Sequence, residues 1–118
     1  MNSITSVTQP AKDIVGVWAL VNKVTDTPIS GSRLKFILDN RWSLTQADTT
    51  TGAVIYHHGG SYTYDGKIYT EQVEFANPNT ASYVRSTAKF TVQIDDTIMT
   101  LIGIDNPWNE IWVRLKSK

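Results

Sequence analysis

Residues 53–76 read AVIYHHGGSYTYDGKIYTEQVEFA, and this stretch carries the strongest fold signal in the chain. Two runs of alternating side chains flank Asp65-Gly66, a dipeptide that suits the two positive φ angles of a type I′ turn. We therefore expect a β-hairpin with a two-residue loop, in which Tyr64 pairs with Lys67.

This register assigns each residue of the hairpin to a face, because neighbouring side chains in a strand point to opposite sides of the sheet. The pairs predicted on one face are Tyr62–Tyr69, Gly60–Glu71, His58–Val73 and Tyr56–Phe75. The opposite face carries mostly small and polar side chains. The aromatic face is therefore expected to be interior, with Gly60 leaving a gap opposite Glu71.

Turn signals divide the rest of the chain in the same way. The strands that we expect are 14–24, 33–39, 42–47, 53–64, 67–76, 87–94, 97–104 and 109–116. The inward-facing apolar residues expected in the other strands include Leu34, Phe36, Leu38, Trp42, Leu44, Phe90, Val92, Met99 and Leu101. The prediction is an all-β chain that forms an eight-stranded antiparallel up-and-down β-barrel, since closure leaves no exposed sheet edge.

Composition agrees with this fold and narrows the possible partners. Threonine, isoleucine and valine number 36 against 13 leucines and alanines, and β-branched side chains favour strands. The 118 residues suit a single domain, which we place at 14–118 after a flexible N-terminal arm at 1–13. A formal net charge of zero argues against nucleic acid and against a charged membrane surface as partners.

Several classes of site and segment are not expected. The chain has no cysteine, which excludes disulfides and thiolate chemistry. Adjacent strand residues point to opposite faces, so His57 and His58 cannot chelate one ion, and we expect neither a metal nor a cofactor. Residues 1–13 do not read as a signal peptide. We expect a cytoplasmic protein, and an exported protein that has lost its signal peptide remains the alternative.

Two short motifs near the chain ends carry a resemblance. Gly16-Val17-Trp18 looks like the Gly-x-Trp signature of lipocalin-type barrels, and Arg114 lies where those proteins often place an arginine. With the runs YHHGGSYTYDGKIYTE and GIDNPWNEIWVR, the chain resembles small bacterial lipocalin-like domains of the calycin superfamily. The resemblance implies that Arg114 packs over Trp18 and closes the barrel base, while Gly16 permits close backbone approach. It implies a fold and no particular reaction.

The predicted interior combines polar groups with aromatic walls. Glu71, His58 and Tyr62 are the candidate catalytic residues, because a buried carboxylate, an imidazole and a phenol can move a proton. The residues that we expect to contact a ligand are Phe36, Trp42, Leu44, Tyr56, His58, Tyr62, Tyr69, Glu71, Phe75, Phe90, Glu110 and Trp112. The first interpretation is binding of a small apolar or aromatic molecule. The alternatives are a cofactor-independent isomerase or cyclase and a filled, purely structural barrel.

The outer faces of the first and last strands suggest a further partner. If Trp18 and Arg114 point inward, their neighbours must point outward. These neighbours are Val15, Val17, Ala19 and Val21 in the first strand and Ile111, Val113 and Leu115 in the last. Monomers rarely expose such an apolar patch, so we expect a homodimer through this surface.

Overall fold

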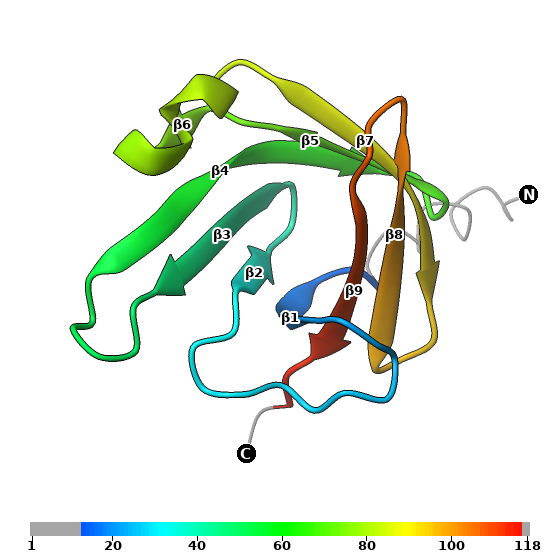
Figure 1. The fold of residues 1–118 in the computed structure, drawn as a ribbon. Helices are drawn as coiled ribbons and strands as arrows, with labels where there is room; N and C mark the ends of the chain where they lie inside the picture. The colour runs from blue at the N-terminus through cyan, green and yellow to red at the C-terminus, as the bar shows by residue number, and fades with distance from the viewer. Residues whose placement is uncertain (1–12, 117–118) are drawn as a thin grey trace, which may run out of the picture.

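Eight antiparallel strands form a closed barrel in the computed structural model, which describes residues 13–116 (Figure 1). The barrel strands are β1 (Gly16–Val21), β2 (Leu34–Ile37), β3 (Arg41–Ala47), β4 (Val54–Tyr64), β5 (Ile68–Gln72), β7 (Thr87–Ile94), β8 (Ile98–Ile104) and β9 (Asn109–Arg114). Each strand pairs with the next, and β9 pairs with β1 to close the ring. The predicted up-and-down barrel is confirmed.

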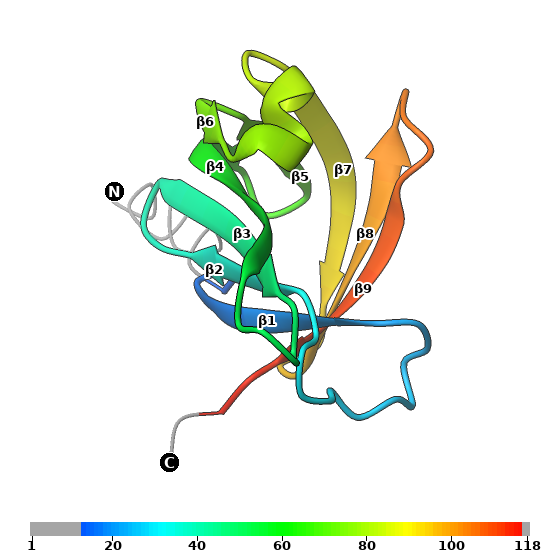
Figure 2. The same cartoon turned by 60° about the vertical axis from the view of Figure 1, so that its left-hand side comes forward.

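The remaining elements lie between β5 and β7. A short strand, β6 (Phe75–Ala76), pairs with β4, and the 3₁₀ helix η2 (Pro78–Tyr83) lies beside both of them (Figure 2). Among the described residues no helix is long and apolar enough to cross a membrane. The predicted arm at 1–13 lies outside the described residues except for Asp13.

The central hairpin keeps the predicted interior face but has a different register. Tyr64 pairs with Tyr69 and Tyr62 pairs with Glu71, so the loop is two residues longer than predicted. The Asp65 side chain explains the wider turn, because its Oδ1 accepts hydrogen bonds from the backbone of residues 67 and 68. A shift of two residues preserves the face. Tyr62, Tyr69 and Glu71 therefore still point inward, and all three are buried.

The predicted gap at Gly60 is wrong. Glu71 lies opposite Tyr62 rather than Gly60. A Cβ atom on Gly60 would lie 2.1 Å from the carbonyl oxygen of Gln72 and 2.9 Å from the backbone nitrogen of Glu74. Gly60 is thus needed because neighbouring backbone occupies the space of its side chain.

Phe75 was predicted to be interior, and the structure places it outside. Tyr62 pairs with Glu71, but Gly59 pairs with Phe75, so one extra residue enters between β5 and β6. A one-residue insertion of this kind reverses the facing of every later side chain. Phe75 is 41% exposed, and its ring lies beside that of His57, with 5.5 Å between centroids.

Strand β2 also presents the face opposite to the predicted one. Lys35 pairs with Leu44 on one side and with Trp18 on the other, and residues opposite each other share a face. Trp18 and Leu44 point into the barrel, so Lys35, which lies opposite both, must point inward as well. Phe36 and its neighbours Leu34 and Leu38 face outward, so their predicted interior placement is wrong.

Large side chains fill the middle and base of the barrel. The buried core residues include Ile14, Trp18, Ile37, Tyr62, Tyr69, Phe90, Val92, Met99, Leu101 and Trp112. Trp18 is held in place by a 2.9 Å hydrogen bond from its Nε1 to the carbonyl of Ile14. The base is consequently a packed core rather than an open channel.

Arg114 closes this base in the arrangement that the resemblance implied. Its guanidinium carbon lies 4.2 Å from the ring centroid of Trp18. The same guanidinium donates hydrogen bonds to the carbonyls of Asp13, Val15 and Asp96. Gly16 has a φ of 153°, and a Cβ atom there would lie 2.8 Å from Nη1 of Arg114. A larger residue at position 16 would therefore displace the arginine.

Candidate functional site

A cavity of about 130 Å³ opens at the end of the barrel opposite Arg114. Its apolar lining comes from Trp42, Leu44, Val73, Ala88 and Phe90, with Tyr83 from η2 and Trp108 from the β8–β9 loop. Its polar lining comes from Arg33, Lys35, His58, Glu71, Ser86 and Glu110. The barrel is thus filled at its base and hollow near its other end.

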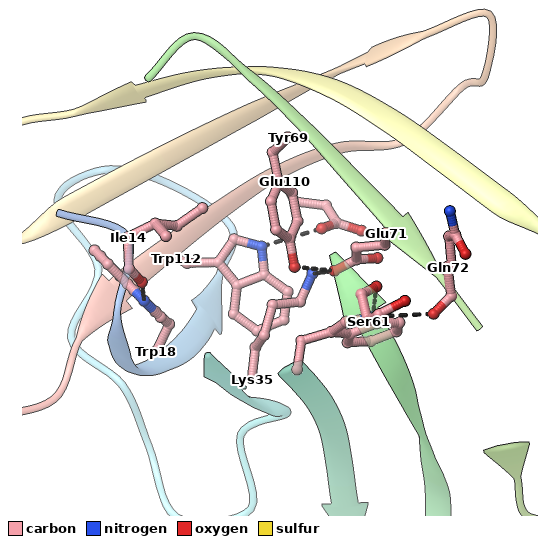
Figure 3. A network of polar contacts seen from close by, with 10 residues as sticks. Ile14, Trp18, Lys35, Ser61, Tyr69, Glu71, Gln72, Glu110 and Trp112 are labelled. Carbon is pink, nitrogen blue, oxygen red and sulfur yellow. Dashed lines mark hydrogen bonds and ion pairs between the residues drawn. The ribbon is translucent and has the colours of Figure 1, made fainter. Parts of the chain in front are cut away.

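Lys35 and Glu71 form the polar floor of this cavity (Figure 3). Nζ of Lys35 lies 2.5 Å from Oε2 of Glu71, and the hydroxyl of Tyr69 donates to the same oxygen at 2.7 Å. Only 1% of Lys35 and 6% of Glu71 is exposed. Burial of a lone charge would be very costly. Each ion is therefore tolerated here because its partner compensates its charge.

Aromatic rings surround the lysine. Its Nζ lies 4.9 Å from the ring centroid of Trp112, 5.4 Å from that of Trp42 and 5.5 Å from that of Tyr69. The negative ring faces offset part of the hydration that the ammonium loses on burial. Burial first, and then the Glu71 carboxylate, raise the pKa of Tyr69 well above its usual value, so its hydroxyl stays protonated and donates.

The second interior carboxylate, Glu110, is half-buried and lines the same cavity. Its Oε1 accepts a 3.0 Å hydrogen bond from Nε1 of Trp112 (Figure 3). Trp112 therefore contacts one charged group of each sign: its nitrogen donates to Glu110, and its ring face lies against the Lys35 ammonium.

One wall of the cavity is a chain of four aromatic rings. The ring centroids of Trp42 and His58 are 5.5 Å apart, those of His58 and Tyr83 are 5.8 Å apart, and those of Tyr83 and Trp108 are 6.3 Å apart. Each neighbouring pair meets edge to face, the arrangement that aromatic rings favour. Trp42 is fixed further by hydrogen bonds from its Nε1 to the carbonyls of residues 61 and 72.

His58 is neutral at pH 7. Burial, with the nearby Lys35 charge as the next cause, lowers the pKa of His58 to about 4. Its Nδ1 lies 3.2 Å from Oγ1 of the buried Thr80, which fixes the ring orientation. An uncharged imidazole offers a ligand one hydrogen-bonding nitrogen and an aromatic edge.

The cavity brings together only part of the predicted site. The predicted residues that line it are Trp42, Leu44, His58, Glu71, Phe90 and Glu110. Tyr69 and Trp112 contact the floor pair. Tyr62 lies toward the base, where its hydroxyl donates to the carbonyl of Leu38, and burial raises its pKa.

The other predicted contacts lie away from the cavity. Tyr56 stacks under Arg33, whose guanidinium carbon is 4.8 Å from the ring centroid, and Phe36 and Phe75 face outward.

Sequence reasoning missed Lys35, the residue that compensates Glu71. An electrostatic argument could have found it, because a carboxylate predicted inside an apolar barrel needs a buried cation as its partner. Tyr83 and Trp108 were not among the predicted ligand contacts. Tyr83 ends η2 and Trp108 lies in the β8–β9 loop, and side-chain directions in such segments do not follow strand alternation.

No protein-family model and no curated protein sequence matches the chain. Within residues 13–116, no three histidine or acidic side chains gather into a potential metal site. The geometry of the barrel cavity is therefore the main basis for assigning a function.

Proposed function

We propose that the protein binds a small, mostly apolar or aromatic molecule in the cavity above Lys35 and Glu71. The observation that carries this proposal is the cavity itself, which has aromatic and aliphatic walls and a polar floor. Ligand sites in proteins typically combine an apolar lining with a few fixed polar groups. A dry cavity of about 150 Å³ accommodates benzene, so about 130 Å³ suits a single six-membered ring.

We also propose that the chain is a lipocalin-like member of the calycin superfamily. The closed eight-stranded barrel is compatible with that fold. The stacked pair of Trp18 and Arg114, with Gly16 against the guanidinium, supports the proposal at the level of side chains. Fold membership alone carries no ligand identity.

Binding can be tested with toluene as a minimal aromatic probe. Titration into ¹⁵N-labelled protein should shift the backbone amides of cavity residues such as Val73 and Phe90. Ala88→Leu should weaken binding about tenfold or more, because the larger side chain fills the cavity. Lys89→Leu adds a leucine to the exposed face of the same strand and should leave binding unchanged. Equal affinities for the two variants would reject this site.

The same cavity supports a second candidate, a cofactor-independent isomerase or cyclase. His58 and Glu71 both line it and could exchange a proton with a bound molecule. A general base works best with a pKa near the operating pH, so a pKa of about 4 for His58 favours binding over this catalytic role. If the enzyme proposal holds, Glu71→Gln abolishes turnover in the protein that remains folded, a condition to be checked because the substitution leaves Lys35 without its counter-ion.

We further propose that two copies of the chain associate through the outer faces of β1 and β9. Val17, Val21, Ile111 and Val113 are half-buried there, and Leu115 is 40% exposed. Two predicted members do not contribute to this surface, because Val15 packs against the core and Ala19 is only 1% exposed. The patch also reaches β2 and β8, since Val17 pairs with Phe36 and Val113 pairs with Ile98. A contiguous apolar surface of this kind is typical of an interface.

A further inference from the structure

We infer that the Lys35–Glu71 pair binds the amide edge of a neutral, planar lactam-type ring, a ligand group that offers a carbonyl acceptor beside an N–H donor. This inference rests on the proposed binding function and specifies its ligand class. It distinguishes such a ring from a plain hydrocarbon and from an organic acid or base of the same size.

The first step is the hydrogen-bonding capacity of the pair. A lysine ammonium has three N–H donors, and the described residues accept one of them, at Oε2 of Glu71. That oxygen also accepts from Tyr69, whereas Oε1 of Glu71 receives no hydrogen bond from any described residue. Both side chains are more than nine-tenths buried, and both line the cavity. Buried polar groups are nearly always hydrogen-bonded, so the cavity floor is suited to a ligand with one acceptor and one donor.

The second step is charge. The charged side chains around the cavity are Arg33, Lys35, Glu71 and Glu110, which sum to zero. A ligand carboxylate would accept from Lys35 but would meet the Glu71 carboxylate beside it. A ligand cation would bind Glu71 but would be repelled by the Lys35 ammonium beside it. A neutral group with an acceptor for Lys35 and a donor for Glu71 adds no uncompensated buried charge.

The third step is shape. A lactam carries its carbonyl and N–H on one edge of a flat ring, so both groups can reach adjacent partners at once. Trp42 and Phe90 border the space above the floor and provide apolar surfaces for the ring. The cavity of about 130 Å³ limits the ligand, or its inserted part, to one such ring.

The probe for this inference is 2-pyridone, compared with N-methyl-2-pyridone, toluene, benzoate and benzamidine. Dissociation constants are measured on the full chain at pH 7 from amide chemical shifts. We expect 2-pyridone to bind about tenfold to a hundredfold more tightly than its N-methyl analogue, which lacks the donor for Glu71. Benzoate and benzamidine should bind more weakly than 2-pyridone. Equal affinities for the two pyridones, or strongest binding of a charged probe, would overturn the inference.

A variant tests whether the floor pair is responsible. Together, Lys35→Met, Tyr69→Phe and Glu71→Leu remove both charges of the pair and the hydroxyl that donates to it, while the side-chain volumes stay similar. The triple variant should lose the preference for 2-pyridone over toluene. The control, Arg41→Met with Glu74→Leu, removes the exposed ion pair on the outer surface and should keep the preference. If the triple variant fails to fold, the probe series on the unaltered protein still tests whether the pair prefers a lactam.

The results separate the two proposals. If no probe shifts the cavity residues, the proposed binding function fails and this inference fails with it. If toluene binds there but the two pyridones bind equally, only this inference fails.

Discussion

Lys35 and Glu71 hold two opposite charges in the centre of the barrel, beside the packed core. Removal of one partner leaves the other buried and uncompensated, whereas replacement of both by apolar groups is often neutral or stabilising. We predict that Lys35→Met lowers the free energy of unfolding by about 3–5 kcal/mol. The triple variant with Tyr69→Phe and Glu71→Leu should be at least as stable as the single variant. Urea unfolding measures both, and a single variant as stable as the parent would contradict the charge assignment.

His58 gives the barrel a pH dependence. Its pKa is about 4 in the folded chain and ordinarily 6.5, so between these values the unfolded chain binds more protons. Stability is therefore complete above about pH 6.5 and falls as the pH drops toward 4. We expect His58→Gln to remove about 1–2 kcal/mol of this loss, a range that allows for the partly exposed ring. The exposed His57→Gln is the control. The same pH slope in both variants of urea unfolding would exclude His58 as the source.

Between β5 and β6 the chain gains the extra residue that turns Phe75 outward, and the same backbone segment passes over Gly60. Gly60→Ala should therefore destabilise the barrel by about 2 kcal/mol or more, since backbone atoms cannot move aside as a flexible side chain would. Gly52→Ala is a useful comparison. Its Cβ meets no atom within 4 Å, but its φ of 75° gives a backbone cost of about 1 kcal/mol. Equal losses in thermal unfolding would contradict the close backbone approach at Gly60.

Strand alternation and turn residues were enough to predict all eight barrel strands and the interior face of the central hairpin. They failed where the facing depends on something outside the strand itself. The outward direction of Phe75 depends on the residue inserted between β5 and β6. The outward direction of Phe36 depends on which side chains lie opposite β2 in β1 and β3. In residues 34–38 the alternating set Leu34, Phe36 and Leu38 is more hydrophobic than the set Lys35 and Ile37, so alternation alone predicts the wrong face.

As a whole molecule, the barrel divides into a packed base and a small cavity. The sequence indicated an aromatic interior but not which part of it is packed. Strand alternation shows that Trp18, Trp112 and Tyr69 point inward, but not how much of the barrel volume they fill. The candidate site was predicted in part for the same reason. Glu71, His58 and Trp42 follow from strand register, whereas Tyr83 and Trp108 come from η2 and the β8–β9 loop, whose packing is decided by the complete fold.

The outer apolar surface leads to a prediction about assembly. We expect the protein to sediment as a dimer at micromolar concentration. Phe36→Lys should give a folded monomer, because the substitution places a charge within the patch that continues across β1. Thr91→Lys, on the outer face of β7, should remain dimeric. Sedimentation velocity over a concentration series measures this, and a parent protein that stays monomeric throughout would reject the dimer.

The central claim is that the barrel has a binding cavity above the Lys35–Glu71 pair, and a crystal structure of the protein soaked with 2-pyridone tests it most directly. We predict electron density for one ring between Trp42 and Phe90, with its carbonyl oxygen within hydrogen-bonding distance of Lys35 Nζ and its nitrogen within that distance of Glu71 Oε1. A cavity without ring density in a fully soaked crystal, or density confined to the outer surface, would contradict the claim.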